Sequence, residues 1–430
     1  MKKKLLALVL VLALVVSLAV ALAACDPKDE GGTGETTISF SPIEKSKIKF
    51  GLICLHGEES TYDKNFIDAA RQAVAALGLD VNTQLVIKTN IPEDAACYEA
   101  AADLVDQGCN VIFADSFGHE SYILQAAKEF PNVRFAHATG TTAHIELQGN
   151  FYNAFASVYQ ARYLAGVAAG MKLAEMYGNG DGKAVSAENA KIGYVGAFPY
   201  AEVVSGYTSF FLGVRSIVPA ATMEVRYTNS WYDADAEENT AKALIDSGCK
   251  LISQHADSMG APLACKDAHI PNVTYNVATT DSNVQGGGSE YNETYIAGSK
   301  VNWEPYFEYL LTCAINGVTA VGFDYCGDLE NGSAMTLELG KAAAAGTAEK
   351  LAAVKAELIA GTRQVFDCST FTVGGKALTS YLADVDTDAN NTPDTQVIIT
   401  ENGITYFAES VYRSAPYFDV RIDGITEIKE

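Results

Sequence analysis

Short apolar runs alternate along the chain with longer segments in which apolar residues recur every three or four positions. Apolar runs bounded by turn residues predict buried strands, and strands separated by amphipathic helices predict a parallel sheet with helices on both faces. The expected strands cover residues 48–55, 84–89, 110–116 and 133–138, and the expected helices cover residues 65–78, 93–107 and 121–129.

The same alternation recurs about 140 residues later, which indicates an internal repeat. Residues 101–139 align without gaps to residues 241–279, and eleven of the 39 aligned positions are identical. The repeat predicts two similar doubly wound α/β lobes, which we place at residues 45–175 and 190–300. We expect residues 301–430 to cross the hinge between the lobes and to complete both of them.

Two such lobes predict a cleft, because ligands of open parallel sheets bind beyond the carboxyl ends of the strands. Aromatic and carboxylate side chains gather at these strand ends. The two copies of the repeat also differ there, since Asp115 aligns with His255 and Phe117 aligns with Asp257. A shared fold with different cleft walls favours a site for an asymmetric small molecule.

The amino-terminal residues predict export. Three lysines precede a long apolar run, and the Leu-Ala-Ala-Cys sequence at residues 22–25 resembles the lipobox of bacterial lipoproteins. We expect residues 1–24 to be a signal peptide, Cys25 to be lipidated, and the polar residues 25–44 to form a flexible tether. An uncleaved membrane anchor is the alternative, because about 20 apolar residues can span a bilayer.

The net charge argues against nucleic acid as a partner, and the spacing of the cysteines bears on whether they form disulfides. The 430 residues include 30 Lys and Arg against 53 Asp and Glu, a net charge of −23, whereas nucleic-acid binding needs a basic face. Nine cysteines are present, and those after Cys25 form no C-x-x-C motif. We expect buried core thiols, with disulfides of undetermined connectivity as the alternative.

The common enzyme motifs H-E-x-x-H, G-x-x-x-x-G-K-[ST] and G-x-S-x-G do not occur in the sequence. The acidic run at residues 384–388 fails the EF-hand pattern, because Ala389 replaces the required glycine. We therefore expect no catalytic residues, no metal and no cofactor. A secreted nucleoside or glycoside hydrolase that uses Asp115 and Asp257 is the alternative.

Several motifs resemble one family. The lipobox, the K-I-x-x-G-x-I pattern at residues 47–53 and the Asp-Lys-Asn-Phe sequence at residues 63–66 resemble the basic membrane protein family, whose members are substrate-binding lipoproteins of ABC transporters. The sequences N-S-W-Y-D at residues 229–233 and Q-H-A-D-S at residues 254–258 resemble its purine and nucleoside branch. One departure is Asn65-Phe66-Ile67, where the family usually has Ser-Phe-Asn.

The resemblance implies a type I periplasmic-binding fold and a monomer, anchored by lipid outside the cell membrane, that delivers a purine base or nucleoside to permease and ATPase subunits. A surface sensor without a transporter is the alternative. A heteroaromatic ring would stack on aromatic side chains, each pair worth about 0.5–1.5 kcal/mol. For Phe66, core packing remains an alternative. The implied roles are stacking by Phe66 and Trp231, with Phe117 or Tyr62 as substitutes, and polar contacts by Asp257 and Asp115, with Ser116, His255 and Asp281 as secondary contacts.

Overall fold

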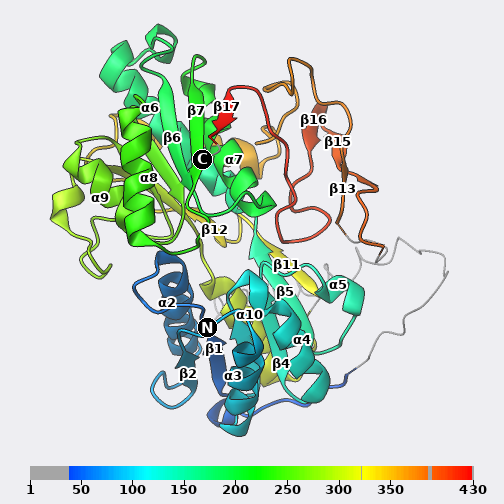
Figure 1. Ribbon diagram of the computed structural model, residues 1–430. Coiled ribbons are helices and arrows are strands. Elements are labelled where there is room, and N and C mark those ends of the chain that lie inside the picture. Colours follow the sequence, from blue (N-terminus) through cyan, green and yellow to red (C-terminus); the bar gives the residue numbers. More distant parts are fainter. Residues whose placement is uncertain (1–37, 321, 386–389, 429–430) are drawn as a thin grey trace, which may run out of the picture. The chain divides into compact units, whose positions relative to one another are not determined.

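The computed structural model describes residues 38–320, 322–385 and 390–428, and two sheets dominate them (Figure 1). The predicted signal peptide, Cys25 and most of the predicted tether lie outside the described residues. Among the described helices, none is both long enough and apolar enough to cross a membrane.

The first lobe contains a six-stranded sheet in which every pair of neighbouring strands is parallel. The expected strands are confirmed as β1 to β4. The order is β11 (Asp324–Gly327), β5 (Phe151–Ala156), β4 (Arg134–Ala138), β3 (Val111–Ala114), β1 (Phe50–Ile53) and β2 (Leu85–Lys88). Its helices are α2 (Thr61–Ala76), α3 (Ala95–Asp106), α4 (Glu120–Glu129), α5 (Ala143–Glu146) and α10 (Glu304–Asn316).

The second lobe repeats this strand order, so the duplicated topology is confirmed. Strands β10, β9, β8, β6 and β7 take the positions that β5, β4, β3, β1 and β2 take in the first lobe. The order is β12 (Ala334–Thr336), β10 (Tyr295–Val301), β9 (Asn272–Tyr275), β8 (Ile252–His255), β6 (Lys191–Gly196), β7 (Thr222–Tyr227) and β17 (Ile425–Glu427). Its helices are α6 (Val158–Gly178), α7 (Ala201–Ile217), α8 (Ala234–Asp246), α9 (Gly260–Asp267) and α11 (Thr347–Ile359).

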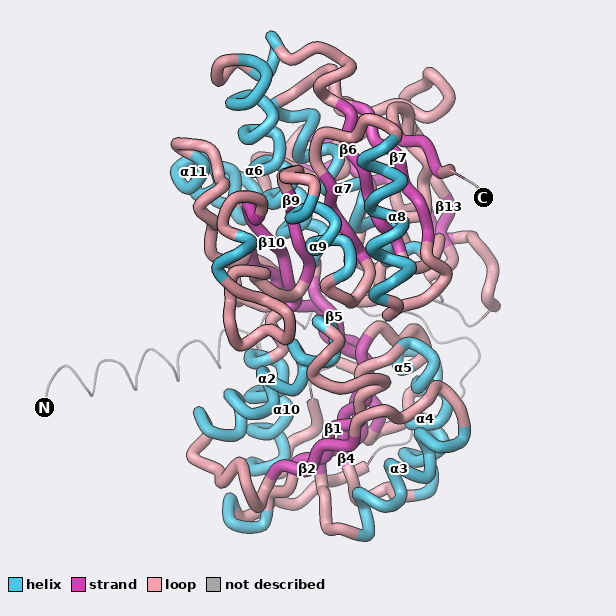
Figure 2. The backbone as a smooth tube through the Cα atoms, turned by 60° about the vertical axis from the view of Figure 1, so that its left-hand side comes forward, coloured by secondary structure: helices cyan, strands magenta, loops and turns pink. Residues whose placement is uncertain are grey.

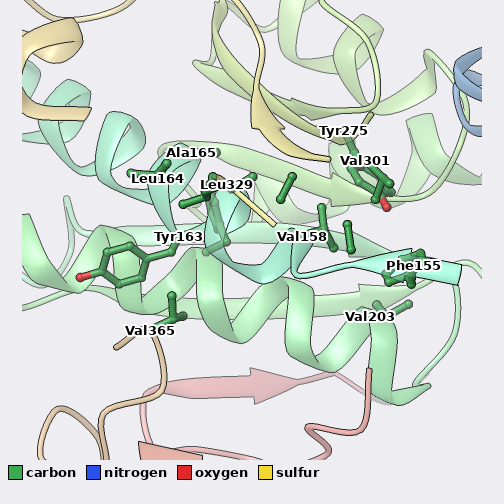
Figure 3. Close-up of a cluster of buried hydrophobic side chains, with 14 of the residues drawn as sticks. Phe155, Val158, Tyr163, Leu164, Ala165, Val203, Tyr275, Val301, Leu329 and Val365 are labelled. Carbon is green, nitrogen blue, oxygen red and sulfur yellow. The ribbon is translucent and has the colours of Figure 1, made fainter. Parts of the chain in front are cut away.

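Helix α6 belongs to the second lobe, although we expected the first lobe to extend to residue 175. It packs on α7 and β10 (Figure 2). A Cβ atom added to Gly166 would lie 2.0 Å from the Phe210 carbonyl oxygen, so the α6 and α7 backbones approach closely there. Figure 3 shows Val158 and Leu164 of α6 in the same apolar cluster as Val203 of α7. Because α6 is apolar nearly all round, it is buried on most sides.

Three segments cross between the lobes and form the hinge. The first segment follows β5, the second follows β10, and the third joins β11 to β12. Hydrogen bonds tie them together: Ser157 N donates to Gly327 O at 2.7 Å, and Asn302 N donates to Ser333 O at 2.6 Å. Residues after 300 do complete both sheets, since β11 joins the first sheet while β12 and β17 join the second.

Residues 362–385 and 390–424, named here the C-terminal extension, include two small antiparallel strand pairs. These pairs are β13 (Leu382–Ala383) with β14 (Thr395–Gln396), and β15 (Ile398–Glu401) with β16 (Ile404–Phe407). The extension has its own aromatic cluster, in which Phe366 stacks on Phe418 at 4.1 Å and contacts Tyr159 of α6 at 5.3 Å. It also reaches the first lobe, because Ser414 N donates to the Asp324 carboxylate of β11 at 2.7 Å.

All eight cysteines in the described part of the chain are free thiols, and seven of them are buried. Burial raises the pKa of the Cys109 and Cys249 thiols to about 11. These side chains are therefore protonated and pack as small apolar groups, which confirms the expectation of core thiols.

Candidate ligand-binding site

A cavity lies between the two lobes, at the carboxyl ends of both sets of strands. It encloses about 390 Å³ of space, counted with the open solvent at its mouth. The residues that line it are Leu55, His56, Tyr62, Asp63, Ser116, Phe117 and Thr139 of the first lobe, and Glu202, Trp231, His255, Asp257 and Tyr275 of the second lobe.

Six of the nine ligand-binding residues named from the sequence line this cavity. These are Tyr62, Ser116, Phe117, Trp231, His255 and Asp257. Three lining residues that we did not name as ligand contacts also lie at strand ends: Asp63 follows β1, Glu202 follows β6, and Tyr275 is the last residue of β9. Their signal in the sequence was the repeat itself, because each strand end of one lobe predicts a matching wall in the other.

Phe66 lies in the core and not at the cavity. Its side chain is fully buried, and its ring stacks on Trp303 at 4.4 Å with an interplanar angle of 26°. We expected the helix to begin at residue 65, which would place Phe66 at the helix start beside the ligand. Helix α2 begins at Thr61 instead, so Phe66 lies in its second turn on the face that packs against α10 and the sheet.

Asp281 is also remote from the cavity. It is exposed and borders a different cleft, together with Lys64 and Lys300. Its carboxylate accepts a hydrogen bond from Asn283 N at 2.8 Å, which stabilises a turn. A position after a strand was therefore not enough to place Asp281 at the cavity, because the loop after β9 turns away from the cavity.

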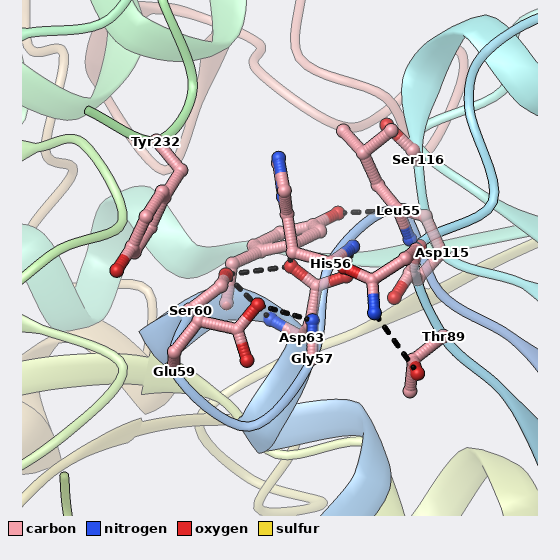
Figure 4. A network of polar contacts seen from close by, with 12 residues as sticks. Leu55, His56, Gly57, Glu59, Ser60, Asp63, Thr89, Asp115, Ser116 and Tyr232 are labelled. Atoms are coloured by element: carbon pink, nitrogen blue, oxygen red, sulfur yellow. Dashed lines mark hydrogen bonds and ion pairs between the residues drawn. The ribbon is translucent and has the colours of Figure 1, made fainter.

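The first lobe presents Asp63 to the cavity from the first turn of α2 (Figure 4). Its carboxylate accepts hydrogen bonds from His56 N at 2.7 Å and from Ser60 Oγ at 2.5 Å, and Ser60 caps the helix by accepting from Asp63 N. Burial raises the pKa of Asp63, but the hydrogen bonds from His56 and Ser60 outweigh it and lower that pKa overall. Asp63 is therefore an ionised, firmly positioned acceptor.

Asp115 lies directly beneath this wall and does not line the cavity. One carboxyl oxygen of Asp115, one carboxyl oxygen of Asp63 and the Cys54 sulfur lie within 4.8 Å of one another. All three residues are buried. Burial, and then the nearby charge of Asp63, raises the pKa of Asp115 well above its usual range. Asp115 therefore keeps its proton to a higher pH than Asp63 does, as expected for two carboxyl groups that share a buried site.

We expect Asp115→Asn to be more stable than the parent protein at pH 8. The neutral amide keeps an oxygen for the 3.1 Å hydrogen bond from Leu55 N and needs no proton. At a pH above the folded pKa of Asp115, the parent protein loses about 1.4 kcal/mol of folding stability for each unit by which this pKa exceeds the pKa in the unfolded chain. Thermal unfolding measured between pH 4 and pH 8 tests this.

The advantage of the Asp115→Asn variant should be mostly lost at about pH 4, where roughly half of the unfolded carboxyl groups are already protonated. Asp63→Asn provides the contrast, because it weakens the capping interactions of an ionised group and should destabilise the protein at pH 8. Equal destabilisation of both variants at pH 8 would contradict the assignment of the proton to Asp115.

Aromatic rings form the wall at the mouth of the cavity. Trp231 packs edge-to-face on Phe198 at 5.0 Å, Phe198 stacks on Tyr200 at 5.1 Å, and Phe117 of the first lobe lies 6.2 Å from Tyr200. Trp231 is only partly buried and lines the cavity. Its indole ring therefore forms part of the cavity wall.

The second lobe supplies a polar wall. Burial, and then the Arg162 charge, lowers the pKa of His255 to about 4, so its imidazole is neutral. Burial raises the pKa of Asp257 well above its usual range, assisted by the carboxyl groups of Glu237 and Asp63. No described residue donates a hydrogen bond to the Asp257 carboxyl group, which leaves this group available to a ligand.

The two walls touch each other in this structure. Thr61 N of the first lobe donates a hydrogen bond to Asp257 O of the second lobe at 2.8 Å, and the rings of His56 and Tyr232 lie 5.5 Å apart. The lobes are therefore in a closed arrangement, and a ligand would reach the cavity when they separate about the hinge.

Duplicated lobes, a three-segment hinge and a cavity at the strand ends define a two-lobed solute-binding protein. A family described as ABC transporter substrate-binding protein, PnrA-like, matches residues 52–332, which include every residue that lines the cavity. The chain belongs to this family of substrate-binding proteins. The family predicted from the sequence is thereby confirmed.

Two curated relatives resemble the chain. A putative ABC transporter glucose-binding protein, TsgA13, of Haloferax volcanii is 32% identical over 61% of this chain and 60% of its own length. A purine-binding protein, BAB2_0673, of Brucella abortus is 35% identical over 53% of this chain and 59% of its own length. The chain thus spans about 60% of the length of each relative.

Solved structures confirm the fold class. A solute-binding protein of an ABC transporter system from Aeropyrum pernix has a TM-score of 0.59 at 16% identity, covering 74% of this chain and 93% of its own. One from Conexibacter woesei has a TM-score of 0.56 at 19% identity, covering 74% of this chain and 98% of its own. At these identities the likeness establishes the two-lobed periplasmic-binding fold and nothing about the ligand.

Proposed function

We propose that this protein binds a purine base or nucleoside between its lobes and delivers it to the permease and ATPase subunits of an ABC importer. It would act outside the cytoplasmic membrane, held there by a lipid on Cys25. The observation that carries the ligand class is the cavity itself, which combines an indole face at Trp231 with carboxyl groups at Asp63 and Asp257.

The chemistry of the walls supports a planar ligand with several hydrogen-bond donors. Ionised Asp63 and the carboxyl oxygens of Glu202 can accept hydrogen bonds, and neutral His255 offers a further polar edge. Ring N–H groups and ribose hydroxyls are suitable donors, and the aromatic wall suits a flat heterocycle. The name of the Brucella abortus relative supports the same class.

The hydrolase alternative receives less support. Its mechanism needs two carboxyl groups facing the substrate, whereas Asp115 lies beneath the cavity wall and only Asp257 of that pair lines the cavity. A protein that only binds would return its ligand chemically intact, and mass spectrometry of the bound and free ligand distinguishes the two functions.

A ligand panel tests the proposal. Adenine, guanine and hypoxanthine, their nucleosides, riboflavin and glucose are titrated by calorimetry, with glucose included because of the name of the Haloferax volcanii relative. We expect 1:1 binding of at least one purine or purine nucleoside. At 100 times its Kd, this ligand should stabilise the protein by about 2.7 kcal/mol.

The Trp231→Ala variant should weaken that binding about 10-fold or more, because it removes the stacking surface and the burial that the indole provides. Tyr309→Ala, a change on α10 remote from the cavity, serves as the aromatic control. Tight binding of glucose or riboflavin with no purine binding would contradict the proposed ligand class.

A further inference from the structure

A second chamber opens directly outside the ligand cavity. It encloses about 940 Å³, again counted with the open solvent at its mouth. The chamber and the cavity share four wall residues, which are Phe117, Thr139, Glu202 and Trp231. The two spaces therefore adjoin at these side chains, and a group attached to a ligand in the cavity could extend past them toward the chamber.

The C-terminal extension builds the outer wall of this chamber. Arg413, Ala415, Pro416 and Asp419 line it, opposite residues of both lobes. The family match ends at residue 332, so this wall comes from a part of the chain that the family does not describe. The hydrogen bond from Ser414 N to Asp324 fixes the wall to the first lobe.

Two large aromatic side chains are unusually exposed at this chamber. Phe117 is 51% exposed and Tyr200 is 48% exposed, and their rings face each other across the two lobes at 6.2 Å. Both line the chamber. Exposed apolar groups that gather in a concave surface typically mark a binding site.

The charges of the chamber do not favour an anion. Arg413 donates through Nε to Ala415 O at 3.2 Å, and its terminal nitrogens bond to no described residue. Two carboxylates, Glu202 and Asp419, also line the chamber, and Asp419 is paired with Arg421. One unpaired guanidinium beside two carboxylates offers hydrogen-bond donors and acceptors without a net positive charge for a phosphate.

We propose that the ligand carries a second, uncharged and hydroxylated ring, such as a sugar unit, and that this chamber binds it. The C–H face of a sugar would pack on Phe117 and Tyr200, while its hydroxyls would bond to Arg413, Glu202 and Asp419. The inference rests on the proposed function and extends its ligand to a nucleoside with an additional sugar.

Calorimetry on the full chain tests the proposal. Adenosine, guanosine and inosine are each compared with the derivative that carries glucose on the 5′ oxygen and with the 5′-monophosphate. For the nucleoside that binds most tightly, we expect the glucosyl derivative to bind at least 10-fold more tightly and the monophosphate at least 10-fold more weakly.

Arg413→Ala and Asp419→Ala should each remove most of the glucosyl gain and change the affinity for the parent nucleoside less than 3-fold, because both residues belong to the outer wall and neither lines the inner cavity. Arg363→Ala is the matched control, since this arginine of the extension pairs with Glu357 away from the chamber. Two independent variants keep the test decisive if one of them fails to fold.

The outcomes separate the two proposals. If nucleosides bind but glucosylation gives no gain, or if both variants leave the gain unchanged, the chamber is not part of the ligand site while the proposed function survives. If no purine base or nucleoside binds the parent protein, the proposed function fails and this inference fails with it.

Discussion

Replacing Phe66 with alanine is expected to lower the free energy of unfolding by about 3–5 kcal/mol, the range measured for removal of a buried aromatic ring. The Phe66 ring is fully buried and contacts Trp303 at 4.4 Å, Tyr62 at 4.9 Å and Phe113 at 5.7 Å. Its removal leaves a cavity that these rigid rings cannot collapse to fill. Denaturant unfolding monitored by circular dichroism measures the loss as a lower midpoint.

Phe117→Ala is the matched control, because it removes the same ring from a position that is 51% exposed. We expect it to change the free energy of unfolding by less than about 1 kcal/mol. If Phe66→Ala instead keeps the stability of the parent and abolishes ligand binding, then Phe66 contacts the ligand and the core assignment is wrong.

The duplicated fold could be predicted because both copies obey the same local rules. Each apolar run that was expected to form a strand in the first lobe does so, and the repeat places its counterpart in the second. Burial on both faces requires near-continuous apolar strands, and that requirement is visible in residues such as Val111–Ala114. Topology then follows, since crossovers between parallel strands are short and of one hand.

The lobe boundary at α6 could not be predicted in the same way. Its sequence is apolar on nearly every face, so periodicity does not reveal which sheet it covers. The contact that decides the matter is the close approach of Gly166 to the backbone of α7, which joins segments more than 40 residues apart. The spacing of apolar residues in the sequence cannot predict such a long-range contact.

The site was predicted at the level of strand ends and less well at the level of side chains. Trp231 and Asp257 line one cavity, whereas Phe66, only four residues from Tyr62, lies in the core. The difference depends on where α2 begins, and helix starts are uncertain by a few residues in a sequence. The outer chamber had no sequence signal, because residues 413–419 reach it only through the packing of the C-terminal extension.

Asp257→Ala is expected to weaken nucleoside binding about 10–100-fold. When a hydrogen-bond donor of the ligand loses its carboxyl partner in a buried site, the binding free energy becomes weaker by about 1.5–3 kcal/mol. Each 1.4 kcal/mol corresponds to about a factor of ten in Kd. The side chain is 95% buried by the closed lobes and yet free of protein donors among the described residues. Its position is fixed by the neighbouring Ser258 N, which donates to the Glu237 carboxylate at 3.1 Å. Calorimetry with the tightest-binding nucleoside measures the loss.

Asp281→Ala provides the control, since it removes an exposed carboxylate that borders a different cleft, and it should leave the affinity within 2-fold. Asp257→Asn separates two roles of the carboxyl group. Burial raises the pKa of Asp257 well above its usual range and so favours the neutral acid, which the amide resembles. The amide should therefore retain much of the binding. A loss as large as that of alanine would mean that the ligand binds the ionised carboxylate, and affinity would then have to increase as the pH rises.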